Sequence, residues 1–185
     1  EDFTDTFEEP RFVDRGKVTA DTLSNTKAQI LEINSKTGLY PLYVAYSIYR
    51  KRCEAVDLKD MTIKKQYQLW RQTVEENVFV ICKTPMAKAI TRRTLLGYRK
   101  GKINAHAFDD IIMQLKEKPE QFKEKVLRGS FWNKENNQMK FDAVVGNPPY
   151  QETISNNDSN RSLSKQLFPE FIKFAIKLGP RYSSL

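Results

Sequence analysis

The sequence is poor in the residues that build metal sites and disulfide frameworks. Among 185 residues there are two cysteines, Cys53 and Cys82, and one histidine, His106. The cysteine spacing matches no metal motif, and one histidine without a partner gives no support to a zinc site or a catalytic triad. We therefore expect no metal site, and we interpret His106 as a helix surface residue. So few cysteines favour a reducing compartment, the cytoplasm.

Long apolar runs are also missing, and none approaches the roughly 18 residues that cross a bilayer. The acidic start E-D-F-T-D-T-F-E-E-P has neither the basic nor the apolar region of a signal peptide. No membrane partner is expected. What the chain does contain is charge: 31 Lys and Arg against 23 Asp and Glu give a formal net charge of +8. This excess favours a polyanionic partner.

The length suits one domain with a proper core and is too short for two comfortable ones. Residues 1–16 are acidic and without periodicity, which predicts an extended N-terminal arm, and residues 17–185 form the domain. Because the chain ends where a strand begins, at Tyr182, we interpret it as a fragment of a longer polypeptide.

Apolar periodicity predicts alternating strands and helices. Strands are expected at 28–34, 78–82, 141–146 and from 182, with a short one at 126–131. Helices are expected at 39–53, 59–76, 84–98 (with Thr84 as N-cap and Pro85 at the first position), 106–116, 119–126 and 163–178, and a loop at 152–162. The alternation predicts an α/β fold with a mostly parallel, open sheet and helices on both faces. Ligands of such sheets bind beyond the carboxyl ends of the strands.

One strand ends in an unusual corner, F-D-A-V-V-G-N-P-P-Y, where Asn147, Pro148, Pro149 and Tyr150 follow the apolar run. The prolines lack N–H groups and leave the carbonyls of Asn147 and Pro148 free of local turn bonding. The Asn147 amide adds a further acceptor, and Tyr150 offers a flat ring for stacking. A proline turn that merely ends a strand is the alternative. The strand context favours a site that grips the NH2 group of a planar substrate, relocalising the nitrogen lone pair for attack.

This motif resembles the catalytic motif of S-adenosylmethionine-dependent amino methyltransferases, above all the DNA adenine-N6 methyltransferases of restriction–modification systems. The resemblance implies a Rossmann-like methyltransferase fold, S-adenosyl-L-methionine as cofactor, and double-stranded DNA with a flipped adenine as substrate. It also implies a restriction or specificity subunit, or a fused domain, as a further partner. Under this resemblance residues 17–185 are a partial catalytic domain.

Cofactor residues are implied by the same resemblance. In A-Q-I-L-E-I-N-S-K-T-G, Glu32 takes the acidic position of the first motif, and Asn34, Thr37 and Gly38 belong to its loop. The remaining assignments are Thr19 beside the cofactor carboxylate, Cys82 and Lys83 after the second strand, and Ser130 and Phe131 in the third motif. Three positions depart from the family pattern, namely Lys36, Cys82 and Ser130.

Two other functions stay open beside methylation of adenine N6 in DNA. One is an amino methyltransferase for protein glutamine or RNA, and the other is a degenerate, non-catalytic fragment that binds DNA. Basic clusters at 50–52 and 92–102, together with Arg161 and Lys165, could bind phosphates, with a solvated helix face as the alternative.

Overall fold

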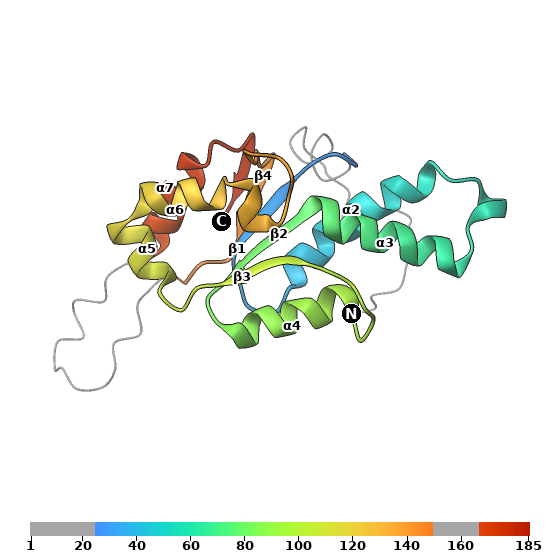
Figure 1. Cartoon of the computed structure of the whole chain (residues 1–185), viewed down its shortest axis with the longest axis horizontal. Coiled ribbons are helices and arrows are strands. Elements are labelled where there is room, and N and C mark those ends of the chain that lie inside the picture. The colour runs from blue at the N-terminus through green and yellow to red at the C-terminus, as the bar shows by residue number, and fades with distance from the viewer. Residues whose placement is uncertain (1–24, 150–166) are drawn as a thin grey trace.

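The computed structural model of the protein describes residues 25–149 and 167–185, and these residues form one α/β unit (Figure 1). Five parallel strands form the sheet in the order β3-β2-β1-β4-β5. The strands are β1 (Ile30–Ser35), β2 (Val78–Cys82), β3 (Asn104–Ala107), β4 (Ala143–Gly146) and β5 (Tyr182–Ser184). Because all five run the same way, their last residues meet along one side of the sheet, which we call the carboxyl edge.

Helices cover both faces of this sheet (Figure 1). One face carries α2 (Leu39–Glu54), α3 (Ile63–Asn77) and α4 (Pro85–Leu96), and the other carries α5 (Ile111–Glu117), α6 (Pro119–Val126) and α7 (Phe168–Lys177). Two short 3-10 helices complete the described elements, η1 (Leu58–Asp60) and η2 (Gly129–Trp132). Side chains alternate along each strand, so successive residues of β1 and β2 enter opposite cores.

The predicted open parallel sheet with helices on both faces is confirmed. The predicted N-cap is confirmed as well, since the Thr84 hydroxyl accepts a hydrogen bond from the backbone N–H of Ala87, with Pro85 in the first helical turn. Helix α7 begins at Phe168, so the start of the predicted helix 163–178 lies outside the described residues, as do the arm 1–16 and Thr19. None of the described helices is long and apolar enough to cross a membrane.

Two local predictions are wrong. His106 lies on edge strand β3, not on a helix, because Ala105 pairs with Val80 and enters the core while α5 starts only at Ile111. The predicted strand at 126–131 does not form. Helix α6 runs to Val126 and is followed by η2, whose Trp132 is buried and donates through Nε1 to the carbonyl of Val126.

Candidate functional site at the carboxyl edge

The asparagine of the predicted catalytic corner lies at the carboxyl edge, directly after β4. Asn147 is exposed, Pro148 is buried and Pro149 is half-buried. The preceding Gly146 packs closely on β1, since a Cβ built there would lie 2.5 Å from the carbonyl oxygen of Ile33. The absence of a side chain at 146 therefore lets β4 end tightly against β1. Tyr150 falls outside the described residues.

A hydrogen bond joins this corner to the loop after β1. Nδ2 of Asn34 donates to the carbonyl oxygen of Asn147 over 3.5 Å, across 113 residues of sequence. Asn34 is 4% exposed and has a positive φ of 65°, a conformation that asparagine tolerates better than most residues. One predicted cofactor residue and one predicted catalytic residue are thus in contact. The bond engages the Asn147 carbonyl, and no described hydrogen bond uses the exposed Asn147 side chain.

Helix α4 holds the rest of the β1 loop. The hydroxyls of Ser35 and Thr91 are 3.2 Å apart, and the hydroxyl of Thr94 donates to the carbonyl of Thr37 over 2.6 Å. Gly38 follows at the start of α2 with φ 78°, and a Cβ there would lie 2.9 Å from the Cα of Thr91. The glycine therefore allows the close approach of α2 and α4, and it fixes the loop at the carboxyl edge.

Glu32 is a buried carboxyl group beneath this loop. Its side chain is 4% exposed, and its Oε2 has no hydrogen-bond partner among the described residues. Burial raises the pKa of Glu32 to about 7, against a smaller lowering by a hydrogen bond with Ser35. A buried carboxyl with a free oxygen can be completed by a cation or a hydrogen-bond donor that enters at the loop.

The residues after β2 offer little to a ligand's hydroxyl groups. The thiol of Cys82 is fully buried, with Sγ 3.8 Å from the hydroxyl of Thr91, and burial raises its pKa to about 11. Lys83 is exposed and carries no acceptor. Neither side chain therefore offers a strong acceptor at this part of the edge.

Ser130 and Phe131 lie on η2, outside the sheet. Ser130 is exposed, whereas the ring of Phe131 stacks on His106 with centroids 3.9 Å apart. Nζ of Lys125 lies 5.7 Å from the centre of the Phe131 ring. Phe131 is thereby placed beside β3, and burial lowers the pKa of His106.

Sequence reasoning missed Asp109, which follows β3. The backbone N–H of Phe108 donates to the carbonyl of Cys82 over 2.9 Å, so the chain after β3 lies next to the end of β2. Asp109 is exposed one residue further on. The signal was the alternation N-A-H-A followed by F-D-D, which is typical of a short strand ending in acids and was interpreted as a helix.

These residues fit a cofactor that carries both cations and hydroxyl groups. Glu32 provides a buried carboxyl whose Oε2 has no partner among the described residues, and Asp109 provides an exposed carboxylate one residue after Phe108, whose N–H bonds the Cys82 carbonyl. The ordered loop from Asn34 to Gly38 lies between the Asn147 corner and α4. Within residues 25–149 and 167–185, no three His, Cys, Asp or Glu side chains gather in a way that could hold a metal ion.

Comparison with known proteins adds a family assignment. The model of the Eco57I restriction-modification methylase family matches residues 76–185, which include β2 to β5 and the N-P-P-Y corner. No curated protein matches the chain.

Proposed function

Because the chain belongs to the Eco57I restriction-modification methylase family, we propose that it is the catalytic part of a DNA methyltransferase acting on adenine N6. S-adenosyl-L-methionine is the proposed methyl donor, and residues 17–185 are the proposed partial catalytic domain. The substrate is double-stranded DNA whose target adenine leaves the helix, because a stacked base cannot enter such a corner. A restriction or specificity subunit, or a fused domain, would supply sequence recognition. Since DNA and this donor meet inside the cell, we place the reaction in the cytoplasm.

The observation that carries this proposal is the exposed Asn147 at the end of β4, tied through Asn34 to the loop after β1. Parallel strands place their ligand sites beyond their carboxyl ends, where this corner stands. The family match covers the same corner.

The acceptors at the corner act on the amino group of the base. The side-chain oxygen of Asn147 and the carbonyl of Pro148 each accept one N–H of the amine, which holds its nitrogen toward the methyl donor. This positioning restores lone-pair density to a nitrogen otherwise conjugated with the ring, and needs no strong base. Stacking on Tyr150 would hold the ring plane and contribute about 1–3 kcal/mol.

The loop after β1 and the ends of the neighbouring strands would bind the cofactor. When bound, S-adenosyl-L-methionine supplies a methyl group on an electron-poor sulfonium. Glu32, Asn34, Thr37 and Gly38 would surround its amino-acid part, and Thr19 is assigned beside the carboxylate. Asp109 would provide the carboxylate acceptor that Cys82 and Lys83 lack, the Ser130 hydroxyl would form a weaker hydrogen bond, and Phe131 offers an apolar contact.

Transfer of a labelled methyl group tests the proposal. Duplex DNA, RNA and a release-factor protein are each incubated with the labelled donor, and the products are digested to nucleosides or amino acids. Label in N6-methyladenine from DNA is the expected result. Label in protein glutamine or RNA instead would overturn the DNA assignment. The hypothesis of a degenerate, non-catalytic fragment is tested by calorimetry with S-adenosylhomocysteine. No heat of binding at millimolar ligand would support that hypothesis.

A further inference from the structure

The positive charge of the chain is concentrated around helix α4. From Val78 to Phe108 there are seven Lys and Arg residues and no Asp or Glu, against a formal net charge of +8 for the chain. All seven side chains are exposed, and none forms an ion pair within the part of the chain that the structure describes. We call them the α4 basic surface: Lys83, Lys88, Arg92, Arg93, Arg99, Lys100 and Lys102.

This surface begins at the carboxyl edge. Lys83 directly follows β2, and Lys88 lies within electrostatic range of both Cys82 and His106. Helix α4 then carries Arg92 and Arg93 away from the edge along its 12 residues, about 18 Å at 1.5 Å per residue. The surface therefore runs from the carboxyl edge, at the end of β2, along helix α4.

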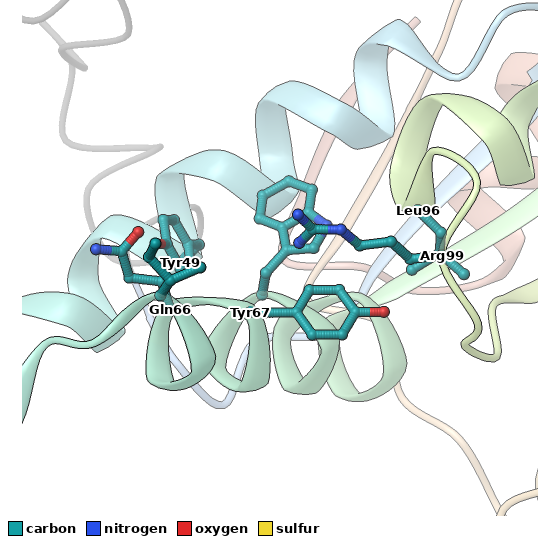
Figure 2. A pocket seen from close by; sticks show the side chains of 7 residues that line it. Tyr49, Gln66, Tyr67, Leu96 and Arg99 are labelled. Atoms are coloured by element: carbon teal, nitrogen blue, oxygen red, sulfur yellow. The ribbon is translucent and has the colours of Figure 1, made fainter.

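Its far end is held rigidly by aromatic side chains. The guanidinium of Arg99 lies 4.6 Å from the centre of the Tyr67 ring, and Figure 2 shows it reaching over that ring from the loop after α4. Tyr67 donates its hydroxyl hydrogen to the carbonyl of Lys100 over 2.8 Å, and Trp70 donates to the carbonyl of Leu95 over 2.7 Å. A cation fixed in advance loses less conformational entropy when it binds an anion.

The hollow beside Arg99 adds flat apolar walls. It measures about 340 Å³ and is lined by Tyr49, Ile63, Gln66, Tyr67, Trp70, Leu96 and Arg99 (Figure 2). Arg93 similarly lies 5.6 Å from the ring centre of Tyr98, which is almost fully exposed. Cations that are interleaved with aromatic rings and form no described ion pair are typical of surfaces that bind nucleic acid.

We propose that the α4 basic surface binds the phosphate backbone of the DNA that flanks the target base. This inference rests on the proposed function, because it takes duplex DNA as the partner. An acidic protein segment is the competing partner, and the continuity of the surface with the carboxyl edge favours DNA. Each phosphate contact releases counterions, so the surface should set much of the salt dependence of binding.

The test compares two triple variants of equal charge. Arg92→Gln/Arg93→Gln/Arg99→Gln removes three charges from the surface. The control Lys118→Gln/Lys123→Gln/Lys173→Gln removes three from the other face, at the N-cap of α6, in α6 and in α7. Binding of a labelled 30-base-pair duplex of arbitrary sequence is followed by fluorescence anisotropy from about 50 to 200 mM salt. The first variant should reduce the slope of log K against log salt by about 2.7, at 0.9 per phosphate contact. The second should leave the slope near that of the wild type.

A second surface variant guards against misfolding. Lys88→Gln/Lys100→Gln/Lys102→Gln changes side chains that make no described hydrogen bond, and it should reduce the slope by the same amount. Equal effects of the surface and control variants, or no effect of either, would overturn the inference. The inference would also be overturned if the surface variants lost binding to an acidic peptide with the sequence of residues 1–10 but still bound the duplex as the wild type does. Calorimetry with S-adenosylhomocysteine is run on the same proteins: DNA binding without cofactor binding would count against the proposed function alone.

Discussion

At the scale of single residues, the carboxyl edge combines one exposed amide, one linking amide and one buried carboxyl group. Asn147 faces solvent, Asn34 donates a long hydrogen bond to its carbonyl, and Glu32 lies below the loop with an oxygen that has no described partner. Each has a different physical role, so each substitution should give a different measurable effect.

Replacing Asn147 by alanine should abolish methyl transfer. The change removes the proposed side-chain acceptor of the substrate amine. It removes no described contact within the fold, because the hydrogen bond from Asn34 uses the backbone carbonyl of Asn147. Loss of one preorganised acceptor typically costs about 100- to 1000-fold in kcat. Labelled methyl transfer and circular dichroism provide the measurement and the fold control. Turnover at the wild-type rate would rule out the role assigned to this side chain.

Replacing Asn34 by aspartate should lower kcat about tenfold with little change in KM for DNA. Aspartate has nearly the same shape and tolerates positive φ, yet it cannot donate to the carbonyl of Asn147. The corner would keep its acceptors but lose its fixed position. Steady-state kinetics separate the two constants. Asn34→Gln is the matched control, because it keeps the amide donor on a side chain that is one methylene longer. An unchanged kcat in the aspartate variant would contradict the positioning role.

Glu32→Gln should remove a pH dependence of folding stability. The carboxyl has a raised pKa of about 7 in the folded state, against 4.5 as its ordinary value, so the folded protein holds its proton to higher pH. The unfolded chain ionises first as pH rises, and the wild type therefore loses stability between about pH 4.5 and 7, up to about 3 kcal/mol. Urea unfolding at pH 5 and pH 8 measures this loss. A glutamine variant with the same pH dependence as the wild type would show that another group titrates.

At the scale of elements, the β1 loop depends on the contact between α2 and α4. Hydroxyls of α4 bind the loop, and Gly38 brings the start of α2 against the Cα of Thr91. The loop geometry is therefore set by two helices as well as by its own residues.

Gly38→Ala should destabilise the fold by about 2–4 kcal/mol. The new Cβ would enter the backbone of α4 at 2.9 Å, and alanine is unfavourable at φ 78° by about 1–2 kcal/mol. Gly179→Ala is the matched control, because Gly179 has φ 64° and nothing within 4 Å of its added Cβ. Chemical denaturation of both variants isolates the packing cost. Equal losses of stability in the two variants would show that the close contact of Gly38 with α4 adds nothing to the cost of the substitution.

At the scale of the whole molecule, two apolar cores join the sheet to its helices. Phe79 occupies the centre of one core, fully buried, with ring centres 5.3 Å from Trp132 and 5.4 Å from Phe141. A defect there should therefore be felt by the sheet and by the helices on that face together.

Phe79→Ala should cost about 3–5 kcal/mol, because it leaves a cavity that rigid aromatic neighbours cannot fill. Ile63→Ala, at a side chain that is 80% exposed, should stay within about 0.5 kcal/mol. Urea unfolding followed by tryptophan fluorescence measures both. A small loss for Phe79→Ala would mean that the core repacks around the cavity.

The sequence by itself determined the class of fold and the position of the proposed catalytic corner after a strand. Strand periodicity, the Thr84 cap and the strand before N-P-P-Y are local signals. They depend on residues close in sequence, so they can be recognised without the tertiary contacts. Only the tertiary structure decided which strand ends meet. The four residues of β3 also fit a helix pattern, so only the sheet order showed that the chain before Asp109 lies against the end of β2, where Phe108 bonds Cys82. The contact between Asn34 and Asn147 likewise arises because β4 pairs with β1 across more than a hundred residues, and such pairing depends on burial summed over the whole sheet.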